Sequence, residues 1–129
     1  MIGFAKFILQ ELIMADSVLR TKSKEFAKDI VFLCRKLKQS GIESALINQL
    51  LRCGTSIGAN VHEAQFAQGT KDFISKFEIA LKECNESEYW LELLYETNGM
   101  PKPDFDALWQ KCTELRRMLV SSVTTLKNK

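Results

Sequence analysis

The spacing of helix-breaking residues is the feature that most limits how this chain can fold. The sequence has two prolines, Pro101 and Pro103, so the first hundred residues contain none. Gly41, Gly69 and Gly99 divide the chain into long blocks. Within each block apolar residues recur at three- and four-residue spacing, and the period-two alternation typical of strands is missing. The sequence therefore predicts an all-α protein.

The blocks predict four helices joined by short connections. Gly41 is expected to stop the first helix and Thr70 to cap the third. A helix cannot continue through Pro101-Lys102-Pro103, so Asp104 is expected to cap the last one. Short connections make consecutive helices antiparallel neighbours, which predicts an up-down-up-down antiparallel four-helix bundle. The expected helices cover residues 17–39, 42–67, 70–98 and 104–126.

The domain organisation follows from these limits. Residues 17–129 are expected to form the bundle domain, and residues 1–16 a short N-terminal extension. Phe4, Phe7, Ile8 and Leu12 would share one face of a helix, so the extension suits a short helix. Met14-Ala15-Asp16 also resembles a translation start, so a native extension and an upstream start both stay open.

Composition places the chain among globular proteins. Its 129 residues are 46% hydrophobic and 26% charged, which predicts one domain with its own core. The net charge of +2 is far from that of a dedicated nucleic-acid binder. Gln10 and Glu11 interrupt the apolar N-terminal run, which is also too short to span a membrane. We therefore expect a cytoplasmic protein without a membrane partner.

Residues that could carry chemistry are few and poorly spaced for it. The four cysteines are scattered, without a C-x-x-C pair, and are expected to be buried in helices, as in a reducing cytoplasm. His62-Glu63 opens like a zincin helix, but a second histidine one turn later is missing. We therefore expect no catalytic residue, no bound metal and no cofactor. The cysteines are Cys34, Cys53, Cys84 and Cys112.

Small residues gather in the second block. Gly54 and Gly58 lie one helical turn apart with Ala59 beside them, which favours the close approach of another helix. No Gly-Lys-Ser/Thr follows, so the run is not a phosphate-binding loop. Close packing is the preferred interpretation over ligand binding.

A polar stripe follows the same block. Ser56, Asn60 and Glu63 share one helical face, and the third block offers charged groups among its apolar positions. Two interpretations stay open: a buried polar ladder that sets the register of the two helices, or a solvated face. In the first case, Asn60→Leu should cost about 1 to 3 kcal/mol. The proposed structural polar face comprises Ser56, Asn60, Glu63, Lys82, Glu83 and Glu86.

The middle of the chain resembles a known family. The order and spacing of its polar and apolar positions are similar to those of the four-helix bundle proteins related to the ones encoded in 23S rRNA intervening sequences. The resemblance implies a bacterial, non-enzymatic homopentamer, and a related group partners a reverse transcriptase and RNA. The matching residues are Gly54-Thr55-Ser56-Ile57-Gly58-Ala59-Asn60, Glu63-Ala64, Lys71-Asp72-Phe73, Lys76, Ile79-Ala80, Lys82-Glu83, Glu86 and Tyr89-Trp90-Leu91.

Charge is distributed unevenly between the first and third blocks. The first is rich in lysine and arginine, and the second half of the third is rich in glutamate. This pattern suits either a head-to-tail contact between copies or two solvated faces that compensate each other across one bundle, and the family resemblance favours the contact. Trp90 and Trp109 are expected to be exposed at that contact. We expect an interaction scaffold that assembles with itself; the alternative is a nucleic-acid-associated accessory protein. The possible nucleic-acid contacts are Lys22, Lys24, Lys28, Arg35, Lys36 and Lys38.

Overall fold

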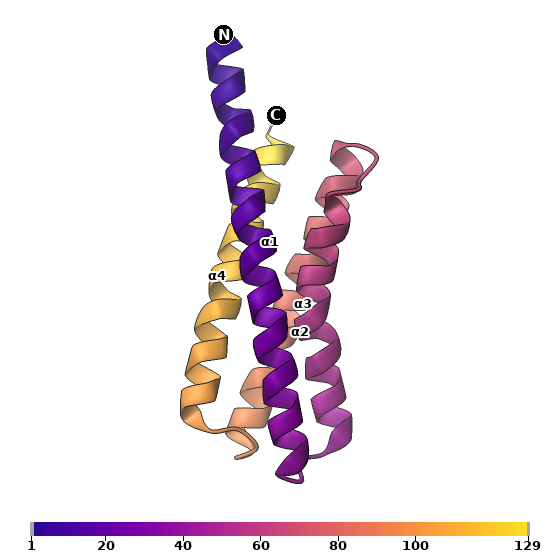
Figure 1. Ribbon diagram of the computed structural model, residues 1–129, viewed down its shortest axis with the longest axis vertical. Helices are drawn as coiled ribbons and strands as arrows, with labels where there is room; N and C mark the ends of the chain where they lie inside the picture. Colours follow the sequence, from indigo (N-terminus) through magenta and orange to yellow (C-terminus); the bar gives the residue numbers. More distant parts are fainter. Residues whose placement is uncertain (1, 129) are drawn as a thin grey trace.

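Four long helices make up the described structure (Figure 1). A computed structural model describes the backbone of residues 2–128 and the side chains of Lys6 and residues 10–128. The helices are α1 (Ile2–Gln39), α2 (Ser44–Ala64), α3 (Thr70–Glu96) and α4 (Lys102–Lys127). The described residues contain no strand. The prediction of an all-α four-helix bundle is confirmed.

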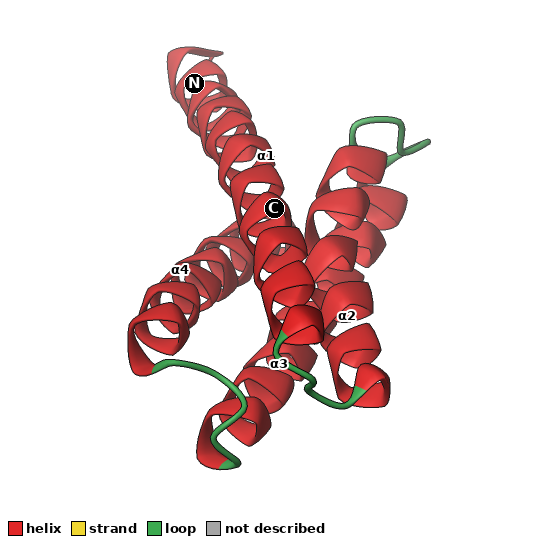
Figure 2. Cartoon of the chain, turned by 60° about the horizontal axis from the view of Figure 1, so that its bottom comes forward, coloured by secondary structure: helices red, strands yellow, loops and turns green. Residues whose placement is uncertain are grey.

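Each helix packs against the two helices next to it around the bundle. Contacts join α1 to α2, α2 to α3, α3 to α4, and α4 back to α1. Helices α1 and α3 are therefore diagonal to each other, and their outer faces look in opposite directions. Short loops connect the helices (Figure 2). Among the described helices, none has a stretch long and apolar enough to cross a membrane.

The core is one apolar cluster that draws on all four helices. Phe26 of α1 and Phe77 of α3 are its largest fully buried side chains. Leu50 of α2 and Leu119 of α4 complete the same interior, each with no exposed surface. Apolar residues at helical spacing thus produce one continuous core, because each helix turns a single stripe inward.

The first helix is longer than its sequence predicts. We expected it to begin near Ser17, whereas α1 runs unbroken from Ile2 to Gln39. The extension is thus helical and continuous with the bundle. The side chains of Phe4, Phe7 and Ile8, whose shared face suggested a helix, lie outside the described residues. Nothing between residues 14 and 17 carries a strong stop signal, so the helix continues through this point.

The residues predicted to cap the third and fourth helices are not the N-cap residues of α3 and α4. Helix α4 begins at Lys102, so Pro103 lies in its first turn and Asp104 follows inside the helix rather than capping it. A first-turn proline costs no hydrogen bond, because its N–H would have no partner within the helix. Gly69, not Thr70, occupies the N-cap of α3. Gly41 follows the end of α1 with φ of +78°, the left-handed conformation that suits a helix stop.

The small residues of α2 permit a close approach to α1. A Cβ atom on Gly54 would lie 2.8 Å from Cγ1 of Ile30, inside van der Waals contact. A Cβ atom on Gly58 would lie 3.2 Å from the backbone oxygen of Ser23. The predicted close helix packing is confirmed at these two positions.

Candidate functional site

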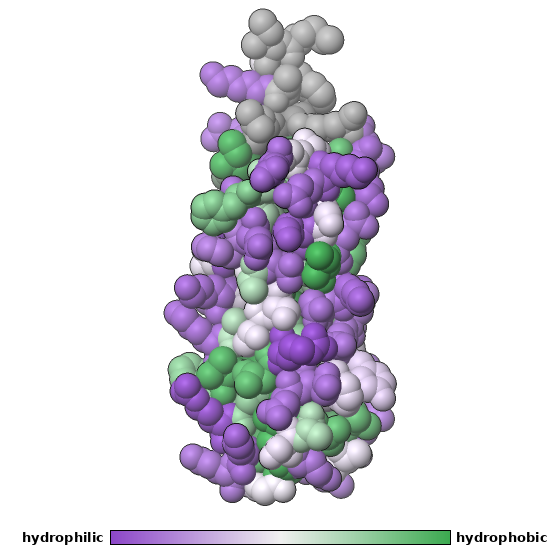
Figure 3. All heavy atoms as spheres, turned by 90° about the vertical axis from the view of Figure 1, so that its right-hand side faces the viewer, coloured by the Kyte–Doolittle hydropathy of each residue, from purple (hydrophilic) through white to green (hydrophobic). Residues whose placement is uncertain are grey.

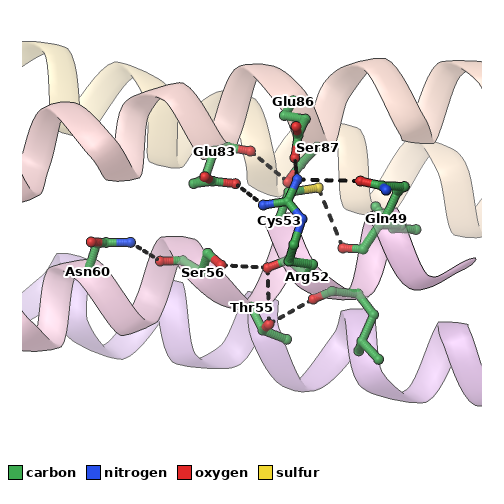
Figure 4. A network of polar contacts seen from close by, with 11 residues as sticks. Gln49, Arg52, Cys53, Thr55, Ser56, Asn60, Glu83, Glu86 and Ser87 are labelled. Carbon is green, nitrogen blue, oxygen red and sulfur yellow. Dashed lines mark hydrogen bonds and ion pairs between the residues drawn. The ribbon is translucent and has the colours of Figure 1, made fainter.

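The polar stripe of α2 is organised around Arg52 (Figure 4). Its guanidinium forms an ion pair with Glu83 of α3 at 3.4 Å and another with Glu86 one turn later. Both carboxylates are on α3, so Arg52 joins the two helices along their seam. Arg52 is not among the residues predicted for the polar face, although it lies four residues before Ser56 on the same side of the helix. That spacing was the signal by which it could have been found.

Ser56 and Asn60 form hydrogen bonds within their own helix. The Ser56 hydroxyl donates to the Arg52 carbonyl at 2.6 Å, and the Asn60 amide donates to the Ser56 carbonyl at 2.8 Å. No hydrogen bond from Asn60 to α3 is seen among the described residues, because the nearer backbone carbonyl accepts from this short side chain.

The remaining members of the polar face lie at its edges. Glu63 reaches Lys76 of α3, with 3.9 Å between the charged atoms. Lys82 is exposed on α3. Ser56, Asn60, Glu83 and Glu86 are half-buried and Glu63 is exposed, so the face combines the two open interpretations: it joins α2 and α3, yet stays in contact with solvent.

This geometry lowers the expected cost of Asn60→Leu. The substitution removes a half-buried bond to a carbonyl that already takes part in the helix, so we expect a loss below about 1 kcal/mol. Arg52→Leu is the matched comparison, because it leaves Glu83 and Glu86 without their partner, and should cost more. Urea unfolding followed by circular dichroism measures both. A loss above about 2 kcal/mol for Asn60→Leu would contradict the local role.

A basic ridge runs along the outer face of α1. We use this name for Lys24, Lys28, Arg35 and Lys38, which are all exposed. Among the described residues, no carboxylate lies within 4.0 Å of their charged nitrogens. Lys24, Lys28 and Arg35 are spaced by four and seven residues, which places them on one side of the helix. The ridge therefore presents uncompensated positive charge.

The other two expected nucleic-acid contacts point elsewhere. Lys22 forms an ion pair with Glu114 of α4, and Lys36 lies 2.8 Å from Asp104 of α4. These two lysines join α1 to α4, so the structure separates them from the ridge. The six candidate residues thus divide into four on the outer face and two in a helix seam.

Acidic residues of α3 divide in the same way. Glu88 pairs with Arg116 of α4 at 2.7 Å, and Glu83 and Glu86 pair with Arg52. Glu92 and Glu96 are exposed, and no described cation lies within ion-pair distance of either. We call these two residues the acidic end of α3. It lies on the helix diagonal to the basic ridge.

Exposed aromatic residues differ from those expected. Trp90 packs against the core, and Trp109 stacks on Phe105 with ring centroids 5.5 Å apart, so neither tryptophan is a freely exposed group. The exposed aromatic side chains include Phe32, Phe66 and Tyr89. The face formed by α2 and α3 is mostly hydrophilic, with apolar residues in small separate groups (Figure 3).

The four cysteines are buried free thiols, one in each helix, as expected. Burial raises the pKa of Cys34 to about 11 and that of Cys53 to about 12. Contact with Cys84 and burial raise the pKa of Cys112 as well. Thiolates are the reactive form, so these groups are poor nucleophiles. Within the described residues, no three His, Cys, Asp or Glu side chains are grouped to hold a metal ion.

Thiol titration tests this description. At pH 8 the native protein should react with a disulfide reagent roughly a hundredfold more slowly than the denatured chain, in which all four thiols are free. Asn48→Cys, at an exposed position of α2, should add one fast-reacting thiol and serves as the control. Fast reaction of any native cysteine would mean that its burial is incomplete.

Comparison with known proteins shows to which family this chain belongs. The model of the 23S rRNA-intervening sequence protein family matches residues 15–121, which is most of the chain. The chain belongs to this family. The resemblance seen in the sequence is therefore confirmed. None of the curated proteins compared matches the chain.

A solved structure supports the same assignment. This chain is similar in structure to a protein with unknown function from the S23 ribosomal protein family of Bacteroides thetaiotaomicron, known from a crystal structure. The two chains are 44% identical and superpose with a TM-score of 0.83, over 85% of this chain and 98% of the other. Neither the family description nor this neighbour names an enzymatic reaction.

Proposed function

We propose that this member of the 23S rRNA-intervening sequence protein family is a non-enzymatic interaction scaffold that assembles with itself. The observation that carries the proposal is the placement of two unlike charged surfaces on diagonal helices, the basic ridge on α1 and the acidic end of α3. Because the outer faces of diagonal helices look in opposite directions, one copy can present its ridge to the acidic end of the next. The family resemblance supports a homopentamer as the assembled form.

The ion pairs between helices of the same chain support this proposal. Lys22, Lys36 and Asp29 of α1 form ion pairs with α4, and Arg52 of α2 forms ion pairs with two glutamates of α3. The ridge and the acidic end are groups of like charge on α1 and α3 that have no such partner among the described residues. Unlike surfaces favour a repeating head-to-tail contact over a two-fold contact, in which each surface would meet itself.

Exposed apolar groups next to the charges support a contact as well. Phe32, which is 63% exposed, lies on α1 between Lys28 and Arg35 in the sequence. Tyr89, which is 59% exposed, lies about one turn before Glu92 of α3. In protein–protein interfaces, a few aromatic side chains that become buried at the centre, inside a polar rim, usually supply much of the binding free energy.

Light scattering and charge reversal test the scaffold. Wild-type protein at micromolar concentration in moderate salt should show the mass of an oligomer. Lys28→Glu with Arg35→Glu should weaken self-association by about tenfold or more, as should Glu92→Lys with Glu96→Lys, and the four changes together should restore it. Arg117→Glu, on the exposed outside of α4, is the control. A monomeric wild type would overturn the proposal.

A nucleic-acid-associated function is the second candidate, favoured by the uncompensated charge of the basic ridge. Four exposed cations repeated around an oligomer would release counterions from a phosphate backbone, giving binding that weakens steeply with salt. Sequence preference should be weak, because phosphate contacts carry no base information. In a gel-shift titration, Lys24→Glu with Lys28→Glu should abolish such binding. Tight, sequence-selective RNA binding at physiological salt would instead favour the accessory role over the scaffold.

A further inference from the structure

The first turns of α1 stand beyond the ends of the other three helices (Figures 1 and 2). We call residues 2–10 the arm; its sequence is IGFAKFILQ, which is apolar apart from Lys6 and Gln10. The arm precedes residue 15, where the family match begins. It is therefore a feature of this chain outside the part shared with the family model.

An open apolar pocket lies at the base of the arm. It encloses about 360 Å³ between the first part of α1, the end of α2, the start of α3 and the end of α4. Leu12, Ala64, Phe73 and Leu126 each contribute an apolar wall from a different helix. Among the described residues that line it, Asp16 is the one that carries a charge.

Asp16 is half-buried at the edge of this pocket. Its carboxylate accepts a hydrogen bond from the Gln65 side chain at 2.8 Å and lies 3.6 Å from Nε of Arg20. A carboxylate has lone pairs for more than two donors, so it has capacity for a further cation. The pocket thus offers a mostly apolar surface, with Gln65, Thr70 and Ser122 as its uncharged polar members and one negative group at its edge.

The arm of the same copy cannot fill this pocket while it is helical. The arm and Leu12 belong to one unbroken helix, so the arm leads away from the pocket that Leu12 lines. The arm, with its apolar sequence, and the open pocket thus lie at the same end of the molecule.

We infer that the arm of a second copy of this chain covers the pocket, and that two copies exchange their arms reciprocally. Each copy carries an arm and a pocket at the same end. A two-fold axis between two copies therefore places the arm of each on the pocket of the other. A helical arm of this length spans about 14 Å, enough to lie across the pocket. The single charge of the arm, Lys6, complements Asp16 at the pocket edge. Because copies within one five-membered ring are not related by a two-fold axis, this contact joins copies of two different rings, and it is separate from the charged faces of the proposed scaffold.

Cross-linking between differently tagged chains tests the exchange. One chain carries Ala5→Cys in the arm and the other carries Ala67→Cys in the pocket wall; they are mixed and treated with diamide. Each chain has one added thiol and its native thiols are buried, so a hetero-disulfide reports an arm in the pocket of another copy. We expect at least about tenfold more cross-link than when the second chain carries Asn48→Cys, at the far end of α2, in place of the pocket substitution.

Charge reversal adds a test of geometry. Lys6→Glu and Asp16→Lys should each reduce the cross-link several-fold, and the two together should restore it, with melting temperatures measured to show that the bundles remain folded. Lys28→Glu with Arg35→Glu should leave the cross-link intact, so failure of the scaffold contact and failure of the arm exchange are distinguishable.

Two outcomes would overturn the exchange. The first is an equal yield of cross-link from the Ala67→Cys chain and the Asn48→Cys chain, because the arm would then have no preference for the pocket. The second is sedimentation with phosphatidylglycerol vesicles that is lost in Phe4→Asp with Phe7→Asp and is found without any cross-link. That result would assign the arm to a lipid surface instead.

Discussion

Phe26→Ala is expected to lower the free energy of unfolding by about 3 to 5 kcal/mol. Phe26 has no exposed surface and is among the largest side chains of the core that all four helices share. Its removal loses the transfer free energy of the ring and leaves a cavity that the surrounding helices fill incompletely. Urea unfolding at a fixed protein concentration, followed by circular dichroism, measures the loss.

Phe32→Ala is the matched control for this substitution. Phe32 lies on the same helix six residues later and is 63% exposed, so its truncation should change the free energy of unfolding by less than about 0.5 kcal/mol. Comparable losses for the two variants would mean that α1 is rotated relative to the bundle. A loss for Phe32→Ala that grows with protein concentration would instead place Phe32 in the contact between copies.

Gly58→Leu should destabilise the bundle by about 3 kcal/mol or more. A Cβ atom at this position would already lie 3.2 Å from the backbone oxygen of Ser23, and backbone cannot rotate away as a side chain can. The larger leucine must therefore push α1 and α2 apart, with loss of packing along both helices. Thermal unfolding measured by circular dichroism should show a clear fall in the melting temperature.

Ala59→Leu provides the control for the change at Gly58. Ala59 is the next residue of α2 and is exposed, so the same side chain is added at a place with room for it. We expect little change in stability, since leucine is also a good helix former. If Gly58→Leu were as stable as Ala59→Leu, the close approach of α1 and α2 would not be needed for the fold.

Sequence alone predicts the helices of this protein because their signals are local. Gly41 marks the end of the first helix, and the stripe containing Phe26, Ile30 and Leu37 marks its buried face. The short connections then require antiparallel neighbours. The small residues Gly54 and Gly58 also indicate close packing, although the spacing does not say which helix approaches them.

The candidate surfaces are predicted only in part, because charge in a sequence does not show its partner. Lys22 and Lys28 look alike in the sequence, yet the first is paired with Glu114 across a helix seam and the second lies on the open ridge. Asn60 likewise bonds to its own helix, whereas its neighbour on the stripe, Arg52, reaches α3.

Local spacing thus determined where the helices lie and which stripe of each is buried, since both depend on residues within a few turns. Tertiary structure decided which helix faces Gly58, which cations remain unpaired, and that an apolar pocket opens at the base of the arm. These features depend on the rotation and offset of helices that are distant in sequence. Packing of the complete core sets that rotation and offset, because a buried stripe can interlock with its neighbours in few arrangements.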